Sequence, residues 1–219
     1  MPAKNEDLHG NAPESCPAAL LMIDVINDLD FGEGEQLLEH AKPMARRLAA
    51  LAQRARDLGI PVIYVNDNFG KWRSDFRQQL EHCLEDGVLG KPIAELLKPE
   101  KTDYFVLKPK HSAFFATTLE TLLEYLETKT VIITGLTTDI CVLFTAADAH
   151  MRDLFLVVPE DCSAATHAED HERALALMRG KLDADTTSSE QLDLEALKAG
   201  ETSNSGQSAG RTRSSPAAR

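Results

Sequence analysis

The chain has 219 residues, of which 43% are hydrophobic and 26% are charged, the usual balance of a globular protein. A chain of this length can bury roughly 70% of its unfolded surface, so it needs neither disulfides nor a metal ion to fold. Its 23 basic and 35 acidic residues give a formal charge of −12. This charge argues against nucleic acid or an anionic membrane surface as partners, since both bind basic proteins.

The ends of the chain and its cysteines suggest a protein of the cytoplasm. No apolar run approaches the roughly 20 residues of a membrane span, and the N-terminus lacks the apolar stretch of a signal peptide. We expect residues 1–16 to be flexible, residues 17–199 to form one domain, and residues 200–219, which lack large apolar side chains, to be a disordered tail. The cysteines are too scattered for a disulfide framework and are expected to be reduced; they are Cys16, Cys83, Cys141 and Cys162.

Short apolar runs alternate with helical patterns along the domain. The runs predict strands buried on both faces, at residues 19–23, 60–65, 104–107, 131–135 and 154–158, with a short sixth strand near 182–186. Helices are predicted over residues 37–55, 117–127, 141–151 and 167–179. This alternation predicts a single-domain α/β fold, a three-layer sandwich with a mostly parallel sheet flanked by helices.

Ligands bind such sheets at the carboxyl ends of the strands. That rule selects Asp24 after the first strand, Asn66 and Asp67 after the second, Lys108 after the third, and the turn 135–141 after the fourth. Asn66 is therefore a candidate substrate contact.

The turn from Gly135 to Cys141 links a predicted buried strand to a predicted helix. A cysteine at a helix N-terminus lies at the positive end of the helix dipole, which favours the thiolate. Unpaired amides of the same turn can bind a developing oxyanion. The simpler alternative is a small buried cysteine that packs under the sheet.

Asp24 and Lys108 would complete a catalytic group if they lay near that thiol. Asp24 could take the thiol proton and later activate water, and Lys108 could pair with Asp24 and stabilise the thiolate. Each has a plainer interpretation, because Asp24 could cap a loop and Lys108 could be a surface lysine. The catalytic hypothesis depends on three strand ends supplying complementary groups.

The sequence resembles the isochorismatase-like cysteine hydrolases, which include nicotinamidases and N-carbamoylsarcosine amidase. The resemblance covers most of residues 17–198 and rests on three segments in the expected order. They are Leu21-Met22-Ile23-Asp24, Lys108-Pro109-Lys110-His111-Ser112-Ala113-Phe114-Phe115-Ala116-Thr117 and Thr134-Gly135-Leu136-Thr137-Thr138-Asp139-Ile140-Cys141-Val142. The last two are similar to the family's K-x-x-x-S-A-F-x-x-T and T-G-x-x-x-x-x-C-V motifs.

The resemblance implies a catalytic triad in which Asp24 is the base, Lys108 the triad lysine and Cys141 the nucleophile. It also implies a cis peptide bond between Leu136 and Thr137, with the amides of Thr137 and Cys141 as the oxyanion hole. The members of the family often assemble as dimers or tetramers, so a homo-oligomer is expected here.

Departures from the family pattern narrow the expected chemistry. Metal-binding nicotinamidases carry an Asp-x-His pair and further histidines after the second strand, whereas here Phe69 stands at the first histidine position. The resemblance therefore implies an enzyme without metal or cofactor and argues against nicotinamidase activity. Siderophore-pathway isochorismatases generally lack the cysteine, so Cys141 favours hydrolysis of an amide or carbamoyl C–N bond in a small molecule. The alternatives are a vinyl-ether hydrolase of the isochorismatase type and a binding or scaffold member without catalysis.

Aromatic and histidine side chains are the remaining candidates for substrate contact. Phe69, Trp72 and Phe114 are expected to line or cover a pocket, with local packing as the alternative. His111 could contact substrate, but an exposed loop histidine is the simpler interpretation. His167 and His171 lie one helical turn apart and, without a third ligand, are expected on a solvated helix face.

Overall fold

A computed structural model describes residues 14–68 and 75–201 of the chain. Its centre is a parallel sheet in the order β3-β2-β1-β4-β5, with a short additional strand, β6, paired to β4. The strands are β1 (Ala18–Ile23), β2 (Val62–Asp67), β3 (Tyr104–Lys108), β4 (Thr130–Leu136), β5 (Phe155–Val157) and β6 (Ser163–Ala164).

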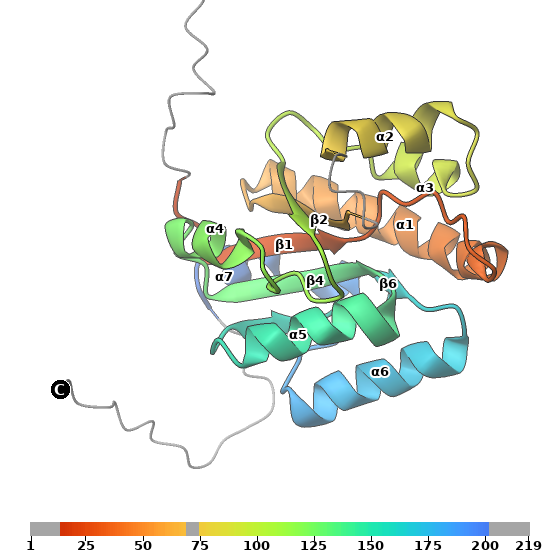
Figure 1. Cartoon of the computed structure of the whole chain (residues 1–219). Coiled ribbons are helices and arrows are strands. Elements are labelled where there is room, and N and C mark those ends of the chain that lie inside the picture. Colours follow the sequence, from red (N-terminus) through yellow and green to blue (C-terminus); the bar gives the residue numbers. More distant parts are fainter. Residues whose placement is uncertain (1–13, 69–74, 202–219) are drawn as a thin grey trace, which may run out of the picture.

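Helices cover both faces of this sheet, and Figure 1 shows α5 and α6 on the side opposite α1. One face packs against α1 (Gly34–Asp57), α2 (Phe76–Glu85), α3 (Lys91–Leu96) and α7 (Leu194–Lys198). The other packs against α4 (Leu119–Tyr125), α5 (Leu143–His150) and α6 (Ala168–Lys181). None of the helices in the described part of the chain is both long and apolar enough to cross a membrane. The predicted three-layer α/β fold is confirmed.

β1 shows how the sequence builds two cores around one sheet. Successive side chains of a strand point to opposite faces. Leu20 and Met22 accordingly pack in the core beneath α1, whereas Leu21 and Ile23 pack in the core beneath α5 and α6. Because both faces are buried, this strand is apolar at every position, which is why it reads as a continuous apolar run.

The direction in which successive strands are added to the sheet reverses between β1 and β4. The chain proceeds from β1 outward to β2 and β3, then returns to the other side of β1 with β4. In open α/β sheets the ligand site lies at the carboxyl ends of the strands beside such a switch point. Gly135 allows the two strands to meet there, since a Cβ on it would lie 2.0 Å from the carbonyl oxygen of Ile23.

Several predicted elements differ from the structure. The sixth strand predicted near 182–186 is reduced to one residue: α6 runs to Lys181, and Asp185 makes an isolated parallel bridge to Val157. The additional strand is β6, which is too short to give a sequence pattern. The strand at 104–107 is an edge strand, so one of its faces is not fully covered, and Phe105 is 63% exposed. The helices α2, α3 and α7 were not predicted.

Candidate active site

Three side chains from distant parts of the sequence meet at the carboxyl ends of β1, β3 and β4. Lys108 Nζ lies 2.8 Å from Asp24 Oδ2 and 3.5 Å from Cys141 Sγ. Asp24 directly follows β1, Lys108 is the last residue of β3, and Cys141 belongs to the turn after β4. The structure therefore brings together the carboxylate, ammonium and thiol that the sequence selects.

The backbone and side chain of Asp24 are both held by β2. Its φ is +51°, a left-handed conformation that aspartate adopts more readily than most residues. Its amide donates to the carbonyl of Val65 at 2.9 Å, and its Oδ1 accepts a hydrogen bond from the Asp67 amide at 2.6 Å. These contacts aim the second carboxylate oxygen at Lys108.

Lys108 is a fully buried cation rather than a surface lysine. Its ammonium also lies 3.5 Å from Asp67 Oδ2 and donates to the carbonyl of Lys110 at 3.2 Å. Burial alone would lower the pKa of Lys108, but Asp24, Cys141 and Asp67 outweigh it and raise that pKa above its ordinary value. Lys108 is therefore charged at neutral pH.

Cys141 lies in a π-helical turn, residues Thr138–Val142, that leads into α5. The peptide bond between Leu136 and Thr137, just before this turn, is cis, which confirms the expectation from the resemblance. The expected thiolate is wrong for the resting protein, because burial and the nearby Asp24 raise the pKa of Cys141 to about 12. Lys108 opposes this rise without overcoming it. The resting nucleophile candidate is therefore a thiol, and it needs a base.

Asp24 is suited to be that base. Burial raises the pKa of its carboxyl above the ordinary value, although Lys108 and hydrogen bonds from Cys141 and Asp67 oppose the rise. A carboxylate with a raised pKa accepts a proton more readily, and the raised value narrows its gap to the thiol. The cluster can thus move a proton from sulfur to oxygen over a short distance.

Two histidines lie closer to this cluster than the sequence indicates. His111 Nδ1 is 3.9 Å from Cys141 Sγ, and its ring contacts Phe144 with centroids 5.7 Å apart. His171 does not point to solvent as expected: its Nδ1 lies 2.8 Å from Thr138 Oγ1, and burial lowers the pKa of its ring. The sequence signal for His111 is its place three residues after the strand-end lysine; His171 has no local signal.

The remaining predicted site residues fall in the interior or outside the described residues. Asn66 is fully buried and its Nδ2 donates to the carbonyl of Ile26 at 2.8 Å. Phe114 is 5% exposed and packs under the guanidinium of Arg152, 4.7 Å from the ring centroid. Phe69 and Trp72 lie outside the described residues. Substrate contact by these four side chains, and the oxyanion role of the Thr137 and Cys141 amides, stay predictions.

Metal-ligating side chains form no candidate metal site in the described part of the chain. Within residues 14–68 and 75–201, no group of three or more His, Cys, Asp or Glu side chains is placed to hold a metal ion. Cys16, Cys83 and Cys162 are buried in the core as free thiols, separate from the Asp24–Lys108–Cys141 cluster. Independence from metal remains a prediction from the sequence.

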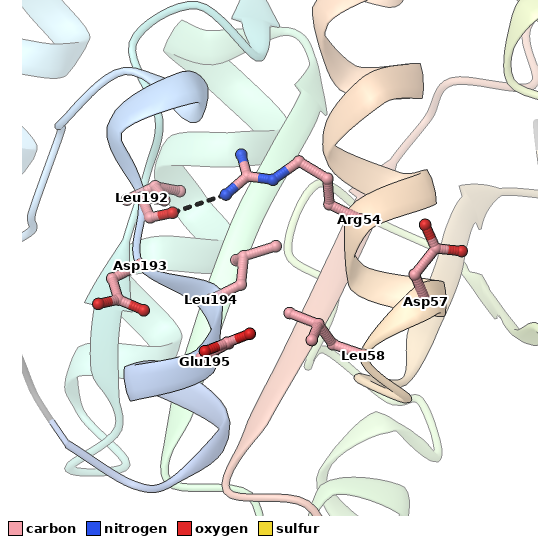
Figure 2. A pocket seen from close by; sticks show the side chains of 7 residues that line it. All are labelled: Arg54, Asp57, Leu58, Leu192, Asp193, Leu194 and Glu195. Carbon is pink, nitrogen blue, oxygen red and sulfur yellow. Dashed lines mark hydrogen bonds between the residues drawn. The ribbon is translucent and has the colours of Figure 1, made fainter.

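An open pocket of about 430 Å³ lies elsewhere, between the end of α1 and the segment that leads into α7 (Figure 2). Arg54 crosses it and donates to the carbonyls of Ser189 and Leu192 at 2.8 and 2.7 Å. This arginine therefore ties the C-terminal segment to α1. The pocket shares no lining residue with the cluster around Cys141, and its other polar lining groups are the carboxylates Asp57, Asp193 and Glu195.

Comparison with known proteins agrees with this architecture. The sequence model of the isochorismatase domain matches residues 18–191. The isochorismatase family protein YaaI of Bacillus subtilis is 41% identical over 174 residues, which cover 80% of this chain and 95% of YaaI. Maleamate amidohydrolase of Pseudomonas putida is 28% identical, covering 72% of this chain and 76% of its own. The crystal structure of N-carbamoylsarcosine amidase from Thermoplasma acidophilum superposes with a TM-score of 0.63 at 27% identity, covering 80% of this chain and 98% of that one.

Proposed function

Because this chain belongs to the isochorismatase family of hydrolases, we propose that it cleaves a C–N bond of a small amide or carbamoyl compound through a thioester on Cys141. The observation that carries the proposal is that Lys108 Nζ lies within 3.5 Å of both the Asp24 carboxylate and the Cys141 sulfur. The names of relatives support the bond type, since they include an amidohydrolase of maleamate and an amidase of N-carbamoylsarcosine.

The reaction begins with the resting thiol. The Asp24 carboxylate takes the Cys141 proton as the sulfur attacks the substrate carbonyl carbon, and the negative charge moves to the carbonyl oxygen. The amides of Thr137 and Cys141 would hold that oxygen. Lys108 keeps its charge throughout, so it offsets first the carboxylate and then the developing negative charge on sulfur.

The second half of the reaction releases the acid. As the carbon–nitrogen bond breaks, the leaving nitrogen takes a proton from a proton-transfer group of the site; water then attacks the thioester carbon and returns a proton to that group, and the carbon–sulfur bond breaks with its electron pair on sulfur. Sulfur recovers its proton from Asp24, which returns the cluster to its resting state. The products are an amine or ammonia and a carboxylic or carbamic acid.

A screen of small amides for ammonia release tests the proposal, with maleamate, N-carbamoylsarcosine and nicotinamide among them. Cys141→Ala should lower turnover by 10³-fold or more, about the loss seen when a covalent nucleophile is removed, and leave the fold intact. Thermal unfolding and circular dichroism check the fold. Undiminished turnover in Cys141→Ala would contradict the thioester route, and retained cleavage of a vinyl ether by that variant would indicate isochorismatase-type chemistry.

A further inference from the structure

His111 is an exposed side chain near the Cys141 thiol. Lys108 is fully buried and Asp24 is 5% exposed, so both lie on the inner side of the sulfur. His111 is exposed, and its Nδ1 is 3.9 Å from the same sulfur. Its ring also contacts Phe144, the second residue of α5, with ring centroids 5.7 Å apart.

We propose that His111 is a second proton-transfer group of the active site, which serves the leaving nitrogen and the hydrolytic water while Asp24 serves the sulfur. This inference rests on the proposed function and divides the proton transfers between two side chains. Imidazole is the side chain whose ordinary pKa lies nearest to neutral pH, so it can both donate and accept there.

The contacts of Asp24 explain why a second group is needed. One carboxylate oxygen accepts from the Asp67 amide at 2.6 Å and the other faces Lys108 at 2.8 Å. A proton taken from the thiol is therefore held on the Asp24 carboxyl, in the buried part of the site. In this proposal the substrate reaches the sulfur from its exposed side, where His111 lies within reach of the groups attached to the carbonyl carbon.

The proton transfers balance over one turnover. In acylation the thiol proton passes to Asp24, the carbon–sulfur bond forms, and the carbon–nitrogen bond breaks with its electron pair on nitrogen. That nitrogen takes a proton from the protonated His111. In deacylation water gives one proton to His111 as its oxygen bonds the thioester carbon, and the departing sulfur takes the proton back from Asp24. Both side chains end as they began.

The ester p-nitrophenyl acetate separates the two roles without knowledge of the natural substrate. Its nitrophenolate leaves without a proton, so acylation of Cys141 needs no donor, whereas hydrolysis of the acetyl thioester needs a base for water. For His111→Gln we expect a nitrophenolate burst within about 3-fold of the wild-type rate. The following steady rate should fall about 100-fold, the lower end of what a general acid–base contributes.

Two further measurements complete the test. His150→Gln, at the exposed end of α5, is the matched control and should leave burst and steady rate unchanged. On the best amide of the screen, His111→Gln should lower kcat/KM about 100-fold, because the amine then leaves without its proton. Added imidazole should restore part of the steady rate, which a merely structural histidine would not permit.

The outcomes separate this inference from the proposed function. An unchanged steady rate in His111→Gln, or equal losses in burst and steady rate, would overturn the role of His111 and leave the thioester mechanism standing. A burst that is absent from the wild type, or that survives in Cys141→Ala, would overturn the nucleophile and with it this inference.

Discussion

A single ammonium, that of Lys108, lies within 3.5 Å of the Asp24 and Asp67 carboxylates and the Cys141 thiol. This ammonium favours the ionised form of both the Asp24 carboxyl and the Cys141 thiol, so the two groups compete for it. Because the thiol is the weakest of these acids, it keeps its proton, and burial together with Asp24 raises its pKa to about 12. The cluster therefore stores the nucleophile in its neutral form.

This balance predicts that Asp24→Asn activates the thiol while it abolishes turnover. The substitution removes the carboxylate charge that raises the pKa of Cys141, and it leaves Lys108 beside the sulfur to favour the thiolate. We expect alkylation of Cys141 by iodoacetamide at pH 7.5 to become about tenfold faster, which corresponds to a pKa lower by about one unit. Mass spectrometry of the Cys141 peptide against time measures the rate.

Asp30→Asn, which changes an exposed carboxylate in the loop after β1, is the control and should leave the alkylation rate unchanged. Slower alkylation in Asp24→Asn would show instead that Asp24 withdraws the thiol proton in the resting state. Turnover that persists in Asp24→Asn would contradict its role as the base.

At the scale of elements, the segment after β3 is held on α5, the helix that follows the nucleophile. Ser112 Oγ donates to Asp148, and the Ala113 amide donates to Thr145 Oγ1 at 3.0 Å. Since this segment directly follows Lys108 and carries His111, its attachment to α5 sets both side chains relative to Cys141. The geometry of the cluster is thus fixed by contact between two elements rather than within one.

Thr145→Val should weaken this attachment. Thr145 is fully buried, and valine keeps its shape but leaves the buried Ala113 amide without its acceptor. We expect a loss of about 1–3 kcal/mol in the free energy of unfolding, together with a lower kcat. Urea unfolding measures the first and the amide assay the second. Thr145→Ser, which keeps the hydroxyl, should retain most of both, and equal losses in the two variants would contradict the role of the hydrogen bond.

The sequence predicts which polar residues lie at the strand ends, but it does not predict the long-range contacts around them or the shortest elements. β1 is apolar at every position, and the first four residues of β3 are aromatic or aliphatic, so a charged residue stands out at the end of each run: Asp24 after β1 and Lys108 within β3. The contact between His171 and Thr138 joins α6 to the turn after β4, 33 residues away, and no local pattern encodes it. β6 and α7 are likewise too short for a periodic signal.

At the scale of the whole molecule, the order of the strands in the sheet decides which strand ends become neighbours. Asp24 and Cys141 become neighbours because β4 returns to the side of β1 opposite β2, which places both residues at the switch point. Continuous apolar runs predict a parallel sheet but leave the order of its strands open. The family resemblance does not give that order either, but its motifs assign Asp24, Lys108 and Cys141 to one triad without it.

Global unfolding should also show a characteristic dependence on alkaline pH. Cys83 and Cys162 belong to the same core, and burial raises the pKa of each thiol to about 12 from an ordinary value of 9.0. Their pKa values are higher in the folded state, so their contribution to stability is complete below pH 9 and is lost as the pH rises toward 12. Each thiol lowers the free energy of unfolding by about 1 kcal/mol between pH 8 and pH 10.

The double variant Cys83→Ala/Cys162→Ala tests this dependence by urea unfolding under reducing conditions. The cavities that it creates lower the stability at both pH values alike, whereas the loss between pH 8 and pH 10 should shrink by about 2 kcal/mol relative to the wild type. Ile63→Val removes a buried methyl group without changing any ionisable group, so it should keep the wild-type loss. The double variant could instead keep the wild-type decrease in the free energy of unfolding between pH 8 and pH 10. That result would show that the two thiols ionise in the folded state and that the core around them admits water.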